Sequence, residues 1–115
     1  MGAAYGRKEV PKMFARVSTY AVPPERQIDA LHAAEEHIGP SLRMQVGYRG
    51  DWLFADPENG RMLTVTLWES EEDMHRTDEY TAWYRRFGTE DAGGRVLDTS
   101  FYEVLRAEMV GATGG

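Results

Sequence analysis

Proline and glycine residues divide this 115-residue chain into six segments of regular hydrophobic pattern, and the order of these segments constrains the fold most strongly. Pro23-Pro24 ends a β-branched and aromatic strand, and proline fits the first turn of a helix. The turn sequence at 56–60 joins two more strands as a hairpin. Ser70 is a good N-cap for a second helix that ends at Gly88. The expected strands are residues 13–21, 45–56, 61–69 and 95–106, and the expected helices are residues 24–38 and 70–87.

This order, strand–helix–strand–strand–helix–strand, is the split βαβ pattern of the ferredoxin-like fold. It predicts an α+β (βαββαβ) domain, with a four-stranded antiparallel sheet and two helices on one face. Gly39-Pro40 is expected to break or kink the first helix, and Gly47 and Gly50 indicate a bulge near the start of the second strand. We expect one domain at residues 13–106, between a flexible N-terminal extension at 1–12 and a flexible tail at 107–115.

The expected strands carry large apolar side chains on both faces. In the third strand, Val65 lies between two leucines on one face, whereas Trp68 lies on the other. In the second strand, Trp52 and Phe54 alternate with Leu53. A sheet with one wet face would alternate apolar and polar residues instead. Two helices cover one face only, so we expect a second copy to cover the other, giving a homodimer through the sheet face.

Composition excludes several classes of function. The net charge is -6, which argues against a nucleic-acid-binding surface. The chain has no cysteine, so disulfides and thiolate metal sites are excluded. His32, His37 and His75 lack the spacing of a ligand set, and no metal is expected. No segment has the length of a membrane span and no targeting signal is recognisable, so a cytoplasmic protein without a membrane partner is expected.

The segment from Leu63 to Asp73, which reads LTVTLWESEED, resembles the strand-to-helix signature of the antibiotic biosynthesis monooxygenase-like proteins. Residues 13–17 and 47–50 are similar to the same family. The resemblance covers about residues 13–106 and implies a dimeric α/β barrel. It also implies three kinds of member: cofactor-free oxygenases of anthrone-like or quinol-like rings, haem-degrading enzymes, and proteins without an assigned activity.

Haem degradation is not expected in this chain. By resemblance it needs an asparagine in the first strand, where this chain has Val17 or Ser18, and a histidine in the second helix, where it has Asp78. His75 is misplaced by almost a turn, so haem would lack its usual axial ligand. No phosphate-binding glycine loop is present either, and no cofactor is expected.

By resemblance, Trp68 lines a cavity between the sheet and the helices, where its indole N–H is available to a substrate carbonyl. Thr64 and Thr66 share its face and offer hydroxyls. Trp52 is a further candidate for substrate binding. Plain core packing explains Trp68 equally well, because tryptophan is usually mostly buried.

The second helix carries four aromatic residues within a wedge of about 100°. They are Tyr80, Trp83, Tyr84 and Phe87. Such a stripe is either core packing or the flat wall of a pocket for a small aromatic ligand, with the phenols of Tyr80 and Tyr84 as proton donors and Tyr84 as the catalytic candidate. Glu35 interrupts the apolar stripe of the first helix. It either points to solvent or faces the cavity as a base, paired with Arg16 or Arg49.

Two main functions remain open from the sequence, beside isomerases or cyclases on the same scaffold. The first is a cofactor-independent monooxygenase acting on an aromatic polyketide-type or quinol substrate, in which the substrate anion activates O₂ and Trp68, Tyr84 and Glu35 are the catalytic candidates. The second is a non-catalytic dimer of the same fold that binds a small molecule or serves as an accessory protein. The fold does not separate them, because one scaffold serves both.

Overall fold

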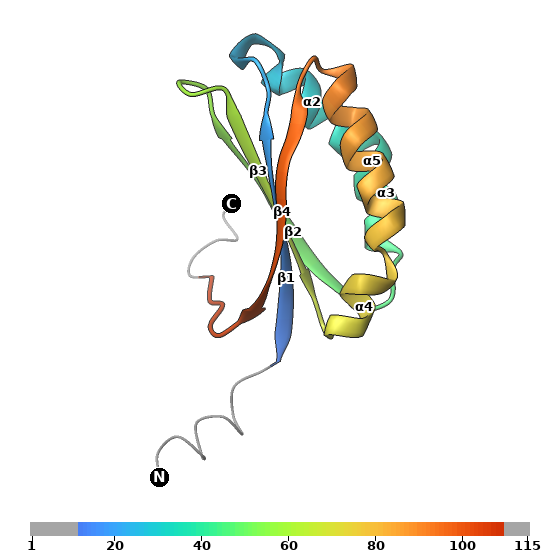
Figure 1. Cartoon of the computed structure of the whole chain (residues 1–115). Helices are drawn as coiled ribbons and strands as arrows, with labels where there is room; N and C mark the ends of the chain where they lie inside the picture. Colours follow the sequence, from blue (N-terminus) through green and yellow to red (C-terminus); the bar gives the residue numbers. More distant parts are fainter. Residues whose placement is uncertain (1–11, 110–115) are drawn as a thin grey trace.

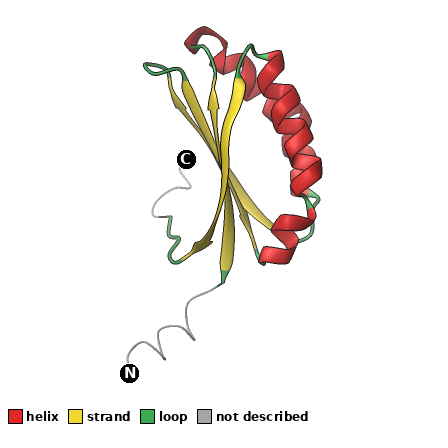
Figure 2. Cartoon of the chain, in the orientation of Figure 1, coloured by secondary structure: helices red, strands yellow, loops and turns green. Residues whose placement is uncertain are grey.

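The four strands form one antiparallel sheet, with every helix on the same face (Figures 1 and 2). The computed structural model describes residues 12–109, except for the side chains at 80, 83–85 and 87. The expectations for residues 1–11 and 110–115 lie outside this described part. The strands are β1 (Met13–Ala21), β2 (Tyr48–Asp56), β3 (Arg61–Trp68) and β4 (Arg95–Val104), in the order β2-β3-β1-β4. The predicted ferredoxin-like α+β fold is confirmed.

The register of the central strands decides which side chains face the helices. In β1 and β3, Phe14 pairs with Trp68, and Arg16 pairs with Thr66. Side chains alternate along a strand, so these residues share one face. Val17 pairs with Val65 on the opposite face, as the alternation predicted. The expected bulge in β2 is also present, because the pairing with β3 shifts between Tyr48 and Gly50.

The first helical region is longer than predicted. It comprises η1 (Pro24–Arg26), α2 (Gln27–Ala33), the π-helical η2 (Ala34–Ile38) and α3 (Gly39–Arg43). The expectation that helix ends at residue 38 is wrong. Pro40 has no amide hydrogen, and the wider π turns directly before it accommodate the proline without ending the helical path.

The second helical region is broken where continuous helix was predicted. It comprises α4 (Glu71–Arg76) and α5 (Asp78–Asp91), which meet at Thr77. Ser70 caps α4 as expected, since its hydroxyl accepts a hydrogen bond from the Asp73 amide at 3.0 Å. The predicted end at Gly88 is wrong because α5 continues to Asp91. The left-handed residue after it is Gly93, at φ 78°.

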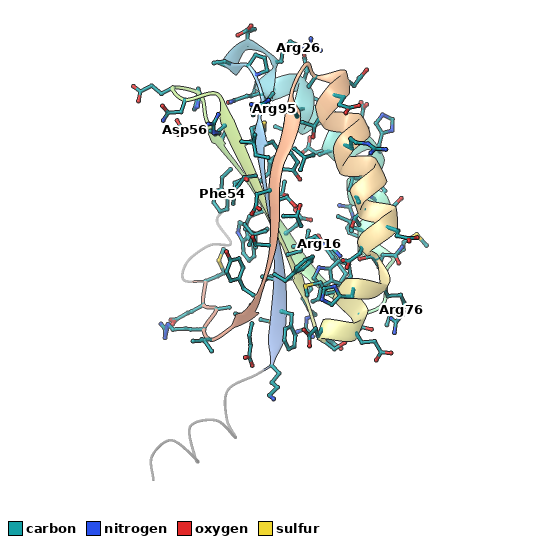
Figure 3. All side chains as sticks on the ribbon, in the orientation of Figure 1. Arg16, Arg26, Phe54, Asp56, Arg76 and Arg95 are labelled. Carbon is teal, nitrogen blue, oxygen red and sulfur yellow. The ribbon has the colours of Figure 1, made fainter. Side chains whose placement is uncertain are left out.

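Two buried clusters lie between the sheet and the helices. One contains Tyr20, Val22, Met62 and Ala92, and the other contains Leu42, Trp68 and Met74. On the opposite face Phe54 is 51% exposed, and Figure 3 shows it pointing away from the helices. The sheet therefore encloses a core on one side and leaves apolar side chains uncovered on the other.

Candidate active site

A cavity of about 550 Å³ separates the sheet from the helices. Its volume is in the range of small-molecule sites. The helical side is mostly apolar and includes Leu31, Ala34, Ile38 and Leu42. The sheet side is mostly polar and is lined by Arg16, Ser18, Tyr20, Thr64 and Thr66. A smaller cavity of about 70 Å³ shares Tyr20, Leu53 and Thr64 with the first and continues it toward the apolar cluster around Met62.

The hydroxyl groups of the polar wall are held by hydrogen bonds. Tyr20 Oη lies 2.9 Å from Thr64 Oγ1, and Ser18 Oγ lies 3.2 Å from Thr99 Oγ1. On the helical side, Thr81 of α5 also borders the cavity, and its Oγ1 donates to the Thr77 carbonyl at 2.8 Å. Fixed hydroxyls of this kind orient a bound ligand, because their own positions are already set by neighbouring groups.

Arg16 is the main site residue that sequence analysis missed, since it was considered only as a partner for Glu35. Its side chain is 2% exposed and borders the cavity. Nη2 donates to the Met74 carbonyl at 2.5 Å, to Thr77 Oγ1 at 3.1 Å and to Asp78 Oδ1 at 2.7 Å. The missed signal was strand parity: Arg16 alternates in step with Phe14 and therefore lies under the helices.

The break between α4 and α5 explains how a buried guanidinium is tolerated. The last carbonyls of a helix carry partial negative charge. Arg16 binds one of them, the Met74 carbonyl, which also accepts from the amide and the hydroxyl of Thr77 where α4 ends. Figure 3 shows Arg16 extending from the sheet toward the helical layer. Its guanidinium also lies 5.6 Å from the centre of the Trp68 ring, a favourable distance for a cation–π contact.

Asp78 links Arg16 to the surface. Its Oδ2 lies 2.6 Å from His75 Nδ1, while its Oδ1 accepts from Arg16. Burial by itself would raise the pKa of Asp78, but hydrogen bonds from His75 and Arg16, together with the positive charge of Arg16, hold this pKa below its ordinary value. The His75 ring packs against Phe101 of β4, with ring centres 4.7 Å apart. The contact with Phe101 holds the His75 ring in place, and the hydrogen bond from His75 in turn holds the Asp78 carboxylate against Arg16.

Replacing Asp78 with asparagine is expected to lower the free energy of unfolding near neutral pH by about 1–3 kcal/mol, because buried Arg16 loses a charged acceptor. The folded-state pKa of Asp78 is depressed, so its stabilisation is present above the unfolded-state pKa of about 3.9 and is lost as pH falls through the folded-state value. Urea unfolding at pH values from about 7 down to about 2.5 measures this effect. The difference in the free energy of unfolding between the variant and wild type should become smaller as the pH falls. The same change at exposed Asp91 is the control. A difference that does not depend on pH would contradict this assignment.

Trp68 does not line the cavity as the resemblance implied. It is fully buried, at 0% exposure, and packs with Leu42 and Met74. Its Nε1–H donates to Thr66 Oγ1 at 2.9 Å, so this hydrogen is not directed at a ligand. Tyr48 packs edge-on against the indole, with ring centres 5.7 Å apart. The structure therefore places Trp68 behind Thr66, where it positions a residue that does border the cavity.

Glu35 borders the cavity, but its side chain is 67% exposed and lies 3.9 Å from His32. The suggested pairings of Glu35 are wrong, because Arg16 binds Asp78 and Arg49 binds Glu69 at 2.6 Å. With exposed Arg43 and Asp51, Glu35 forms the charged opening of the cavity. A carboxylate at this opening meets solvent and ligand alike.

A tyrosine supports this opening on the β2 side. The Tyr48 hydroxyl donates to Asp51 Oδ2. Burial, followed by this hydrogen bond and the negative charge of Asp51, raises the pKa of Tyr48 well above its usual value. Tyr48 therefore remains a protonated donor at all ordinary pH values, and it holds Asp51 at the edge of the cavity.

Of the remaining predicted site residues, some border the cavity and others lie outside the described part of the structure. Thr64 and Thr66 border the cavity from β3. Trp52 also borders it, from β2, although its position opposite Val65 assigns its side chain to the other face of the sheet. The aromatic side chains of α5 lie outside the described part of the structure. They are Tyr80, Trp83, Tyr84 and Phe87, and their roles stay predictions.

The family profile of the antibiotic biosynthesis monooxygenases matches residues 13–86. This match spans more than half of the chain, which therefore belongs to that family. No curated protein sequence is significantly similar to the chain. Within the described residues, no helix has the length and apolar character of a membrane span, and no three potential metal ligands come together.

Solved structures share the fold at low sequence identity. A monooxygenase of Streptomyces coelicolor in complex with the ligand nanaomycin D is 18% identical, with a TM-score of 0.63 over 84% of this chain and 89% of that one. A cofactor-independent oxygenase from Streptomyces nogalater is 8% identical, with a TM-score of 0.56 over 87% of this chain and 98% of that one. A haem-degrading protein from Mycobacterium tuberculosis is 22% identical, with a TM-score of 0.55 over 86% and 98%. At these low identities, the TM-scores show a common fold.

Proposed function

We propose that this protein is a cofactor-independent oxygenase of an electron-rich aromatic substrate of the anthrone or hydroquinone type. The observation that carries the proposal is the cavity of about 550 Å³, with an apolar helical wall and a polar wall that contains a buried arginine. Family membership and the oxygenases that share the fold support the same class of chemistry.

The cavity suits a flat ring system with oxygen on one side. Leu31, Ile38 and Leu53 offer apolar contact, while Thr64 and Thr66 offer hydroxyls from the sheet. A bound ring is removed from water, which strengthens each polar contact that it makes. The charged residues at the opening leave a route for the substrate to enter and for a proton to leave, with Glu35 as the proposed proton acceptor.

The proposed reaction needs no added reductant, because the substrate supplies the electrons. Loss of a proton from the methylene carbon of an anthrone gives an enolate, which transfers one electron to O₂. The resulting radical and superoxide combine into a carbon–oxygen bond, and protonation gives a hydroperoxide. Loss of the second methylene proton and cleavage of the O–O bond give the quinone carbonyl and water. One anthrone and one O₂ thus become one anthraquinone and one water.

Oxygen consumption with dithranol, a dihydroxyanthrone, tests this proposal. Wild type is expected to consume one O₂ for each dihydroxyanthraquinone formed, faster than dithranol oxidises alone. Ala34→Phe places a bulky ring in the cavity wall and should lower turnover at least about tenfold, because a blocked cavity cannot seat the rings. Ala82→Phe makes the same change at an exposed position of α5 and should retain activity. Equal rates with and without protein would exclude the oxygenase.

A second candidate is a non-catalytic binding protein of the same fold. The observation that favours it is the exposure of Glu35, which leaves the described part of the cavity without a buried carboxylate base. Under this alternative, dihydroxyanthraquinone binds to the cavity and Ala34→Phe prevents binding, while O₂ consumption stays at the uncatalysed rate. The oxygen measurement therefore separates the two functions.

We also propose that two copies pair through the outer face of the sheet. Phe54 and Tyr102 are exposed there, and Val17 and Val65 lie between them on the inner strands. Apolar side chains that lie together and exposed on one face of a sheet are typical of a protein–protein interface. A cytoplasmic location is also part of the proposal.

A further inference from the structure

We propose that the smaller cavity, of about 70 Å³, is the binding site of O₂, the second substrate of the proposed reaction. This inference rests on the proposed function, which requires O₂, and it places that molecule beside the aromatic rings. A site for O₂ has to be small, apolar and open toward the reacting carbon. The smaller cavity has the size, the lining and the position that these conditions require.

The volume of the smaller cavity suits a diatomic molecule better than a ring system. In another protein, an apolar cavity of about 150 Å³ takes benzene or xenon, whereas one water molecule occupies about 30 Å³ in the liquid. The volume of about 70 Å³ lies between these two values. The fused rings of an anthrone therefore stay in the larger cavity, and the smaller one is left for a small molecule.

The described lining of the smaller cavity holds water poorly. It carries no charged side chain, and its apolar members include Val22, Ala33, Ile38 and Met62. Its polar members are Tyr20, Thr64 and Thr89, and the hydroxyls of Tyr20 and Thr64 already bond to each other at 2.9 Å. A buried water needs two to four polar partners, whereas apolar O₂ needs none. The lining therefore favours O₂ over water.

The two cavities adjoin along a common border. Five residues line both of them, namely Tyr20, Ala34, Ile38, Leu53 and Thr64. Rings seated in the larger cavity lie against this border, so O₂ in the smaller cavity is next to the ring that reduces it. The hydroxyl pair of Tyr20 and Thr64 stands at the same border, where hydrogen-bond donors stabilise the negative charge that superoxide acquires.

Gly88 supports the same assignment from the helical side. It lies inside α5 and lines the smaller cavity. It has no positive φ, and glycine within a helix lowers stability relative to alanine. A Cβ at this position would meet no atom of the described residues within 4 Å. Neither backbone conformation nor contact with those residues requires glycine here, and its missing side chain leaves the volume of the smaller cavity open.

Methyl NMR under O₂ pressure tests the site without any turnover, because paramagnetic O₂ speeds the relaxation of nearby protons. Met62 and Met74 are both buried, and of these two only Met62 lines the smaller cavity. The relaxation enhancement at the Met62 methyl should exceed that at the Met74 methyl at least about fivefold, because O₂ collects in a cavity and not in a close-packed cluster. Equal enhancement at the two methyls would overturn the inference.

Two variants fill the smaller cavity from different helices. Gly88→Leu extends from α5 into open space and Ala33→Leu extends from α2, and neither position lines the larger cavity. Each variant should reduce the enhancement at Met62 to the level of Met74. Ala82→Leu adds the same side chain at an exposed position of α5 and should leave the enhancement unchanged. An enhancement that survives both filling variants would also count against the site.

Oxygen kinetics test the use of the site in turnover. A ligand of two heavy atoms binds weakly even where it fits, so its dissociation constant lies in the millimolar range or above. The rate with dithranol should therefore rise in proportion to O₂ up to air saturation. Gly88→Leu should lower kcat/KM for O₂ at least about fivefold and leave KM for dithranol unchanged. A raised KM for dithranol with the same dependence on O₂ would assign the smaller cavity to the rings instead.

The outcomes distinguish this inference from the proposed function. A Met62 enhancement that the filling variants remove establishes the O₂ site even where dithranol consumes no O₂, and the oxygenase alone then fails. Consumption of O₂ by a protein whose Met62 and Met74 methyls relax alike leaves the oxygenase and removes the site.

Discussion

Trp68→Ala is expected to lower the free energy of unfolding by about 3–5 kcal/mol, the range for removing a large aromatic side chain from a core. Trp68 is fully buried between Leu42 and Met74, and the indole N–H is hydrogen-bonded to Thr66. Alanine leaves an internal void and a cation–π partner of Arg16 is lost. Urea unfolding followed by circular dichroism measures the change, with a nearly constant m-value.

Two variants make this result specific. Trp68→Phe keeps most of the ring and should cost less, mainly by removing the hydrogen bond to Thr66. Ile28→Ala deletes a large apolar side chain from an exposed position of α2 and should cost about 0.5 kcal/mol or less. If Trp68→Ala cost no more than Ile28→Ala, the assignment of Trp68 to the core would be wrong.

Val65→Asp is expected to convert the proposed dimer into a monomer. Val65 lies at the centre of the outer face, between Val17 of β1 and Trp52 of β2. An unpaired carboxylate buried there costs about 3–5 kcal/mol, which corresponds to roughly 10²–10⁴-fold weaker association. Sedimentation velocity at micromolar concentration should show a dimer for wild type and a monomer for the variant.

The matched control for this change is Val46→Asp. Val46 is exposed in the turn before β2, away from the sheet faces, and the same substitution there should leave a dimer. A wild-type protein that sediments as a folded monomer would contradict the proposed dimer. So would a Val65→Asp variant that still sediments as a dimer.

The strands were predictable because alternation and turn signals are local. Residues 13–21 match β1 in full, and the hairpin, its bulge and the Ser70 cap followed from short-range chemistry. The helix boundaries were less predictable. The π turns before Pro40 and the break at Thr77 depend on how the helices pack, and in the second case on a buried arginine from a strand more than fifty residues away.

The candidate site was predictable in its location and only partly in its members. Strand parity correctly brought Thr64 and Thr66 to the helical face, where they border the cavity. It assigned Trp68 to the same face, but depth within a layer depends on tertiary packing. Arg16 was overlooked because charged residues are rarely buried without a partner, and Asp78 is distant in sequence.

The central claim is that the cavity between sheet and helices is the ligand site. A crystal structure of the protein soaked with dihydroxyanthraquinone tests it most directly. We expect the rings between the helices and β3, beside Thr64 and Thr66, and the outer face of the sheet paired with a second copy. Ligand bound elsewhere, beside a cavity that side chains have filled, would contradict the account.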